Sequence, residues 1–219
     1  MKDVFIKNRV FFILFALFFS VSLFWVAIFG KADTHLFLNS LHHPLADKFF
    51  SHITFLGDGL FIFVYVFIML FISYRNTFSL AIAFAVSGLI IPLLKKIFFH
   101  DWVRPSAYFE GYATLHTVPG VELHCCRTFP SGHSATAFAV FFCFAAVLPK
   151  DWQKVVVFIG GAFIAYSRVY LSQHFLMDVA VGSMIGFFSG WLAVSVMSTP
   201  KQPWLNKRLF QRKNPTDHV

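Results

Sequence analysis

Charged residues are scarce in this chain. They make up 13% of its 219 residues, whereas 58% are hydrophobic and 32 residues are phenylalanine. An ordinary soluble domain carries about 25% charged residues, so this shortage excludes that class of protein. The composition indicates an integral membrane protein.

Cysteine is also scarce, with three residues in the whole chain. They cannot build a disulfide framework, and their spacing fits neither a zinc site of four cysteines nor one of two cysteines and two histidines. Cys143 lies in an apolar run, where we expect an inert packing role. Cys125 and Cys126 are adjacent and cannot pair with each other without strain.

Acidic residues are few beside basic ones: 10 Asp and Glu against 18 Lys and Arg give a net charge of +8. In a soluble protein this excess would suggest nucleic acid as a partner. Here the basic residues lie largely in the tails and in short connections between apolar runs, where they set orientation against anionic lipid. We therefore expect the lipid bilayer, and no nucleic acid, as a partner.

Six apolar segments are long enough to cross a bilayer, given roughly 20 residues for each helical span. The first is too long for the apolar part of a signal peptide and lacks its cleavage site, so we expect a retained helix. The predicted fold is all-α, a six-transmembrane-helix bundle in a single domain over residues 1–219. The expected spans lie near 10–30, 54–73, 78–98, 132–148, 154–171 and 175–197.

The division of Lys and Arg between the two sides of this bundle predicts its orientation, because the side with the excess stays in the cytoplasm. Both termini are therefore expected inside, with a basic tail over 199–219 that anchors at anionic lipid. One side holds 11 of these residues: Lys2, Lys7, Arg9, Arg75, Lys150, Lys154, Lys201, Lys207, Arg208, Arg212 and Lys213. The other side holds 4: Lys31, Lys48, Arg104 and Arg127.

Two connecting segments on the outer side are more than short turns. Residues 33–50 mix Leu and Phe with polar residues, which fits either a short amphipathic helix at the interface or an irregular loop. Residues 99–131 form a long polar segment that we expect to cover a pocket.

Polar residues gather where the ends of four expected helices meet at the outer face. Charge next to apolar helices costs free energy, so it marks a candidate site. Two or three cations, a hydroxyl group and the free N–H groups of a helix start can together hold phosphate. The residues concerned are Lys95, Lys96, Arg104, Ser131, Gly132, His133, Ser167, Arg168, His174 and Asp178.

His174 and Asp178 are four residues apart at the start of the sixth expected helix, hence on one helix face. A carboxylate that binds one ring nitrogen leaves the lone pair of the other nitrogen free to attack. His133, on another helix, can supply a general acid. Each feature alone is also typical of structural or interfacial residues; their convergence on one face favours catalysis.

These motifs resemble those of the type 2 phosphatidic acid phosphatase family, membrane lipid phosphatases related to vanadium haloperoxidases and glucose-6-phosphatase. Two of the family's three blocks match without departure, Pro130-Ser131-Gly132-His133 and Ser167-Arg168 followed by His174 and Asp178. The first block, a Lys, six residues and Arg-Pro, departs: seven residues separate Lys96 from Arg104, and eight separate Lys95 from it. The local sequence LKKIF favours Lys95 as the equivalent lysine and leaves Lys96 as the alternative.

The resemblance covers residues 90–190 through its motifs and implies an acid phosphatase/vanadium haloperoxidase-like core. It implies that His174 is a nucleophile that forms a phosphohistidine, that Asp178 orients it, and that His133 is the general acid. It implies no cofactor and no metal. The residues it implies for phosphate binding are Lys95, Arg104, Ser131, Gly132 and Arg168.

We therefore expect a lipid phosphatase or pyrophosphatase that acts at the outer, periplasmic face of a bacterial inner membrane. Candidate substrates are undecaprenyl pyrophosphate, phosphatidylglycerol phosphate, phosphatidic acid and a lipid A phosphate. Two alternatives stay open: a lipid phosphotransferase on the same scaffold, and a transporter whose charges line an ion path.

Overall fold

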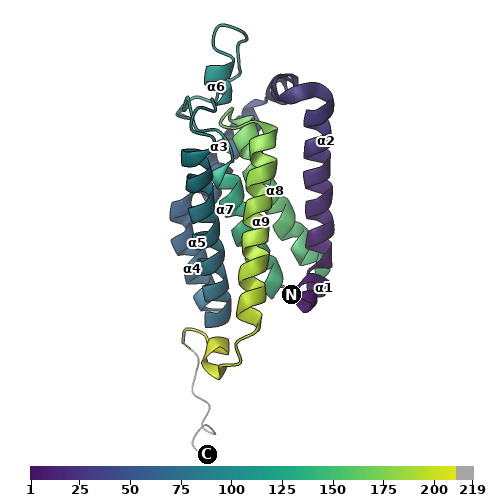
Figure 1. Cartoon of the computed structure of the whole chain (residues 1–219), viewed down its shortest axis with the longest axis vertical. Coiled ribbons are helices and arrows are strands. Elements are labelled where there is room, and N and C mark those ends of the chain that lie inside the picture. Colours follow the sequence, from purple (N-terminus) through teal and green to yellow (C-terminus); the bar gives the residue numbers. More distant parts are fainter. Residues whose placement is uncertain (211–219) are drawn as a thin grey trace, which may run out of the picture.

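The computed structural model describes residues 1–210, and these residues are helical apart from turns and connections (Figure 1). An isolated bridge between Val103 and Cys126 is the β-type pairing found among them. The all-α expectation is confirmed. The elements are α1 (Lys2–Lys7), α2 (Arg9–Ser40), α3 (Pro44–Ile53), η1 (Thr54–Gly57), η2 (Gly59–Phe61), α4 (Ile62–Leu70), α5 (Tyr74–Ile97), α6 (Pro105–Tyr108), α7 (Gly132–Val147), α8 (Asp151–Tyr170), α9 (Leu176–Ser198) and η3 (Pro203–Asn206).

Three helices of the described chain, α2, α5 and α9, are long and apolar enough to cross a membrane. A fourth candidate is the pair Pro44–Gly57 and Gly59–Leu70, which is bent by 58°. Helix α7, with 16 residues, is shorter, and α8 runs beside it. Three to four of the six expected spans thus meet a length and composition test, and the number six stays a prediction.

The prediction of one continuous helix over residues 54–73 was wrong. The 3₁₀ turns η1 and η2 replace its first part, and α4 occupies only Ile62–Leu70. Asp58 stands between the two turns in extended conformation, and its side chain accepts a hydrogen bond from the Leu60 N–H at 2.9 Å. An Asp that caps a new turn interrupts the helix, which apolar content alone does not reveal.

The outer half of α2 and helix α3 account for the segment 33–50. Helix α2 continues to Ser40 through a break at Gly30, where φ is 75°. After a short turn, α3 begins at Pro44, with the His43 ring accepting from the Leu45 N–H at 3.2 Å. The helical alternative for this segment is confirmed.

Helices α7 and α9 pack with their backbones almost in contact, because glycines line the α9 side. A Cβ atom added at Gly182 would collide with the carbonyl oxygen of Ser131, and one at Gly186 with that of Ala135. The close approach lets the Ser131 N–H donate to the backbone oxygen of Asp178 at 2.9 Å. The packing therefore joins two of the predicted motif blocks directly.

Gly182→Ala should destabilise the protein by about 1–3 kcal/mol, because the added methyl group meets backbone atoms that cannot move aside. Thermal unfolding in detergent measures the effect. Gly88→Ala on α5 is the matched control, since a Cβ atom there has nothing within 4 Å. An unchanged melting temperature for Gly182→Ala would contradict the close packing.

The segment 99–131, here called the cover segment, lies over the end of the bundle that is opposite α1 and η3 (Figure 1). Asn39 of α2 binds the His116 backbone twice, through Nδ2 to the carbonyl oxygen at 2.9 Å and through Oδ1 from the N–H at 2.8 Å. The His116 ring lies 3.0 Å from the Asp47 carboxylate of α3. These contacts fix the cover segment to α2 and α3.

Cys125 and Cys126 form a disulfide, a pairing that their adjacency in the sequence did not favour. The expectation of strain considered only the two residues themselves. Their backbone is held by the other arm of the cover segment, because Cys126 pairs with Val103 and the Arg104 N–H donates to the Cys125 carbonyl oxygen at 2.8 Å. Cys143 is free and buried, as expected.

Candidate active site

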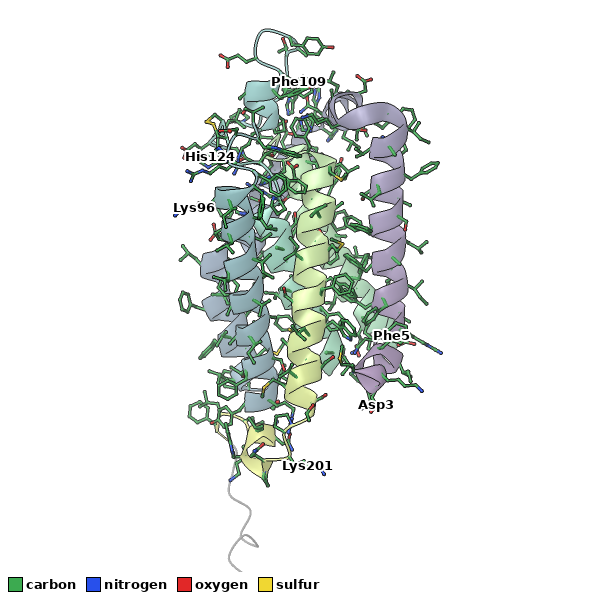
Figure 2. The ribbon with its side chains drawn as sticks, viewed as in Figure 1. Asp3, Phe5, Lys96, Phe109, His124 and Lys201 are labelled. Atoms are coloured by element: carbon green, nitrogen blue, oxygen red, sulfur yellow. A yellow bond between two sulfur atoms is a disulfide. The ribbon has the colours of Figure 1, made fainter. Side chains whose placement is uncertain are left out.

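The predicted site residues lie together at the end of the bundle beneath the cover segment. Side chains along the middle of the bundle are mostly carbon, whereas nitrogen and oxygen atoms gather toward its two ends (Figure 2). The last turn of α5, the start of α6, the start of α7, the end of α8 and the start of α9 each contribute at least one predicted residue. The three motif blocks, which are separate in the sequence, thus converge on one site.

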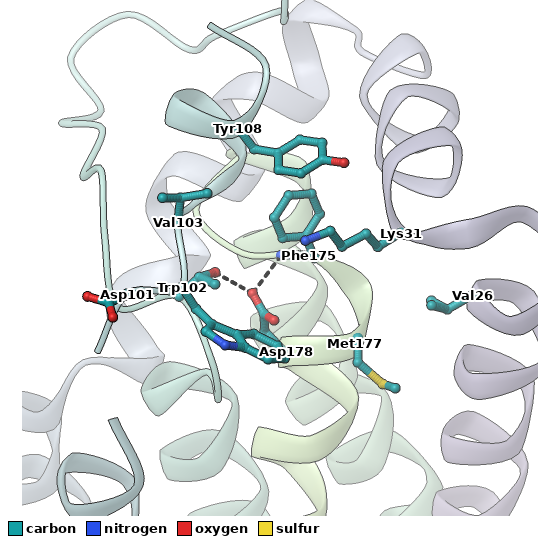
Figure 3. A pocket seen from close by; sticks show the side chains of 10 residues that line it. Val26, Lys31, Asp101, Trp102, Val103, Tyr108, Phe175, Met177 and Asp178 are labelled. Carbon is teal, nitrogen blue, oxygen red and sulfur yellow. Dashed lines mark hydrogen bonds between the residues drawn. The ribbon is translucent and has the colours of Figure 1, made fainter. Parts of the chain in front are cut away.

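His174 and Asp178 form a buried pair, each about 2% exposed. His174 Nδ1 lies 3.4 Å from Asp178 Oδ2. The same Oδ2 accepts hydrogen bonds from the Phe175 N–H at 3.0 Å and from the Thr128 hydroxyl (Figure 3). Asp178 caps the helix it stands on, so its carboxylate is fixed before any substrate binds. With Nδ1 facing the carboxylate, Nε2 is the ring nitrogen left for chemistry.

Thr128 is a site residue that the sequence analysis missed. Its Oγ1 lies 3.3 Å from His174 Nδ1 and also binds Asp178 Oδ2, so it touches both members of the pair. It stands at the end of the cover segment and is 2% exposed. Its position three residues before Ser131 was the available signal, since the turn into α7 must pass the site.

Burial and positive charge keep His174 neutral. Burial lowers the pKa of its imidazole well below 6.5, and the charges of Arg104, Arg168 and Lys95 lower the pKa further. A group whose pKa is lowered in this way is unprotonated at neutral pH, with a lone pair available.

The two arginines are anchored by side chains that the sequence analysis did not name. Arg168 is 8% exposed, and its Nη1 donates to the Thr54 hydroxyl at 2.7 Å, while its Nε has no partner among the described residues. Arg104 Nη1 donates to Gln173 Oε1 at 3.0 Å. An unpaired buried guanidinium N–H is costly, so it favours an anionic ligand at this position.

Ser131 is the N-cap of α7 and is fully buried. Its Oγ accepts from the Ser134 hydroxyl at 2.8 Å and from the Ser134 N–H at 3.4 Å, which leaves its own O–H proton free to donate. The N–H groups of Gly132 and His133 belong to the first turn, where no helical acceptor exists. The start of α7 therefore offers three donors to an anion.

Lys95 and Lys96 differ in burial and in their effect on His174. Lys95 is half-buried and its charge acts on His174, whereas Lys96 is exposed and has no such effect. These differences favour Lys95 over Lys96 as the predicted site lysine. Its identification through the sequence LKKIF is consistent with this placement.

A cavity of about 530 Å³ lies between the cover segment and the α3–η1 region. Its walls include His133 and Arg168 together with Thr54, Asp58 and Gln173. Three further polar side chains also line it: His52, Glu122 and His124. The cavity gives a polar group direct access to the predicted general acid and to one predicted phosphate ligand.

A second cavity, of about 470 Å³, reaches Asp178 from the side of α2 (Figure 3). Lys31 extends over its aromatic wall, with Nζ 4.5 Å from the centre of the Tyr108 ring and 5.1 Å from that of Phe175. Val26 and Met177 form the apolar part of the lining. The sequence analysis assigned Lys31 only to membrane orientation.

No group of three or more His, Cys, Asp or Glu side chains within residues 1–210 is arranged to hold a metal ion. The donors that meet at the site are cations and N–H or O–H groups, which suit an anion. Metal-independent catalysis stays a prediction.

Comparison with known proteins identifies the family. Residues 76–202, more than half of the chain and all of the predicted site, match the model of the PAP2 superfamily. The chain therefore belongs to the PAP2 superfamily and is a multi-pass membrane lipid phosphatase.

The chain is also similar to individual named proteins. A lipid A 4'-phosphatase of Bacteroides thetaiotaomicron is 28% identical over 183 residues, which cover 76% of this chain and 77% of that protein. The structure of Aquifex aeolicus LpxE matches with a TM-score of 0.66 and 27% identity, covering 74% of this chain and 92% of that one. A phosphatidylglycerolphosphate phosphatase of Bacillus subtilis, 21% identical with a TM-score of 0.62 over 90% of this chain and 98% of that one, shares the fold.

Proposed function

We propose that the protein hydrolyses a phosphate ester of a lipid through a phosphohistidine at His174. The observation that carries the proposal is the neutral, buried His174, fixed by Asp178 on one nitrogen and acted on by three cations. A neutral imidazole with one nitrogen fixed is a nucleophile, and the cations attract the phosphoryl group to it.

The first step forms a bond from His174 Nε2 to phosphorus and breaks the bond from phosphorus to the lipid oxygen. His133 donates a proton to that oxygen as it leaves. In the second step a water oxygen attacks phosphorus, His133 takes a proton from the water, and the P–N bond breaks. The products are the dephosphorylated lipid and inorganic phosphate, with both histidines restored.

Five residues bind the transferring group in this proposal. The side chains of Lys95, Arg104 and Arg168 neutralise its charge, and the free Ser131 hydroxyl and the Gly132 N–H donate hydrogen bonds to its oxygens. Unpaired donors at Arg168 and at the start of α7 support this role. Asp178 stabilises the positive charge that develops on His174 as the P–N bond forms.

We further propose a phosphorylated glycolipid of the lipid A type as the substrate. The 530 Å³ cavity beside His133 combines hydroxyl, amide, imidazole and carboxylate groups with the apolar side chains of Phe55, Pro119 and Val121. Such a mixed lining suits a sugar, which has polar edges and apolar faces. The name of the Bacteroides relative supports the same class. Undecaprenyl pyrophosphate, phosphatidylglycerol phosphate and phosphatidic acid are the competing substrates.

The membrane arrangement in this proposal has six spans, both termini in the cytoplasm and the site on the periplasmic side. The N-terminus and η3 lie at the opposite end of the bundle from the cover segment, which supports it (Figure 1). Lys201 and Lys207 of the basic tail fall on the proposed cytoplasmic side, while Arg212 and Lys213 lie outside the described residues.

Purified protein in detergent should release phosphate from lipid A at least about tenfold faster than from the three competing lipids, because the sugar of lipid A presents more hydrogen-bonding groups to the polar side chains of the cavity. The rates should be equal with and without EDTA. Loss of activity in EDTA would contradict metal-independent chemistry. Release from another lipid in preference would overturn the glycolipid assignment alone, and release from none would overturn the hydrolase proposal.

The same reactions distinguish a phosphotransferase. Analysis of the products in the presence of glycerol should find inorganic phosphate rather than glycerol phosphate. Mainly phosphorylated alcohol would indicate that the phosphohistidine is resolved by transfer instead of by water.

A further inference from the structure

The break between α3 and α4 packs against two site residues at once. Thr54 accepts the hydrogen bond from Arg168 at 2.7 Å, and Asp58 Oδ2 lies 4.0 Å from His133 Nε2. Between them, a Cβ atom at Gly57 would stand 3.2 Å from the His133 carbonyl oxygen and 2.7 Å from Ile164. The segment 54–58 therefore lies directly on α7 and α8, outside the three motif blocks.

Asp58 is held in place independently of His133. Its Oδ1 accepts from the Leu60 N–H at 2.9 Å, which leaves Oδ2 directed to the histidine. Among the described residues it is the acidic side chain within 4.0 Å of His133. Both side chains line the 530 Å³ cavity, and they are 43% and 29% exposed.

Other groups around His133 are mostly positive. A general acid must carry its proton until the leaving oxygen needs it, and nearby cations oppose that protonated form. A carboxylate at 4.0 Å has the opposite effect. The charged or titratable groups that face His133 or line its cavity are Arg168, His174, Arg104, Lys95, Asp58, His52, Glu122 and His124.

We propose that Asp58 is a positioning residue for the general acid: its carboxylate, 4.0 Å from His133 Nε2, favours the protonated imidazole against the effect of the cations of the site. The proposal rests on the proposed function. Residues 54–58, where the second expected span is broken, thereby become a fourth segment of the active site. Thr54 serves the same segment by holding Arg168.

Asp58→Asn tests the charge separately from the fold. The asparagine amide oxygen can still accept from the Leu60 N–H, so the cap of η2 is kept. We expect kcat to fall about tenfold or more with little change in KM, and the alkaline limb of the kcat–pH profile to move about one unit or more to lower pH. Asp58→Glu should recover part of the rate. The exposed Glu110→Gln is the control for loss of a carboxylate and should leave the profile unchanged.

An unchanged kcat and alkaline limb in Asp58→Asn, with active wild-type protein, would overturn this proposal alone. So would an equal loss in Asp58→Asn and Asp58→Ala accompanied by a lower melting temperature and an unmoved alkaline limb, since that result indicates a purely structural role. Absence of phosphate release from the wild-type protein would instead overturn the proposed function, which keeps the two failures distinct.

Discussion

His174→Ala should abolish phosphate release, with a fall in kcat of about 10³-fold or more, because it removes the atom that attacks phosphorus. The fold should persist. Asp178 keeps its hydrogen bonds from Thr128 and from the Phe175 N–H, so the start of α9 retains its cap. Phosphate release and thermal unfolding in detergent measure the two properties.

The matched control is His100→Ala. His100 belongs to the cover segment and is exposed, with its partner Asp101 also at the surface. It should retain full activity. Substantial turnover by a folded His174→Ala protein would reject His174 as the nucleophile.

Asp178→Asn should lower kcat by about 10²- to 10⁴-fold while KM changes little. With its amide oxygen in the Oδ2 position, the asparagine keeps the contact with His174 Nδ1 but has no negative charge to stabilise the positive charge that develops on His174 as the P–N bond forms. The amide oxygen can still accept from Thr128 and Phe175, so the local structure should survive. Steady-state kinetics separate the two parameters.

Asp33→Asn supplies the comparison for this second variant, because Asp33 is an exposed carboxylate on α2 away from the predicted motifs. It should behave like the wild type. If Asp178→Asn kept the wild-type kcat, the pair of His174 and Asp178 would be structural and the orienting role would be wrong.

The motif residues could be predicted from sequence because short spacings fix their relative positions. His174 lies four positions before Asp178, and the two side chains do meet, as predicted. The expectation of a shared helix face was wrong, because α9 has its N-cap at Phe175 and His174 precedes the helix, while Asp178 reaches back toward that cap. Pro130-Ser131-Gly132 has the composition of a helix start. Apolar runs also located α5, α7, α8 and α9 to within a few residues.

The supporting residues could not be predicted in this way, because their roles come from contacts between distant segments. Thr54 and Arg168 are separated by 114 positions, and Asp58 lies in a run whose apolar content indicated a continuous span. The Cys125–Cys126 bond was missed for the same reason, since the opposite arm of the cover segment sets their backbone.

The role of the glycines on α9 also depends on contacts between distant segments, which the sequence alone does not reveal. Their sequence shows small residues in an apolar helix, but only the packing of α9 on α7 shows that Gly182 faces the Ser131 carbonyl group. That contact brings the motif block that contains Asp178 next to the start of α7, where we predict phosphate binding.

The covalent intermediate is the most direct test of the proposed chemistry. A substrate with a radioactive phosphate should be mixed with wild-type protein, quenched in alkali within milliseconds, and the labelled peptide mapped. We predict an acid-labile, alkali-stable label on the peptide that contains His174, and no label on His174→Ala. Label that persists in His174→Ala, or label on another residue, would contradict the account.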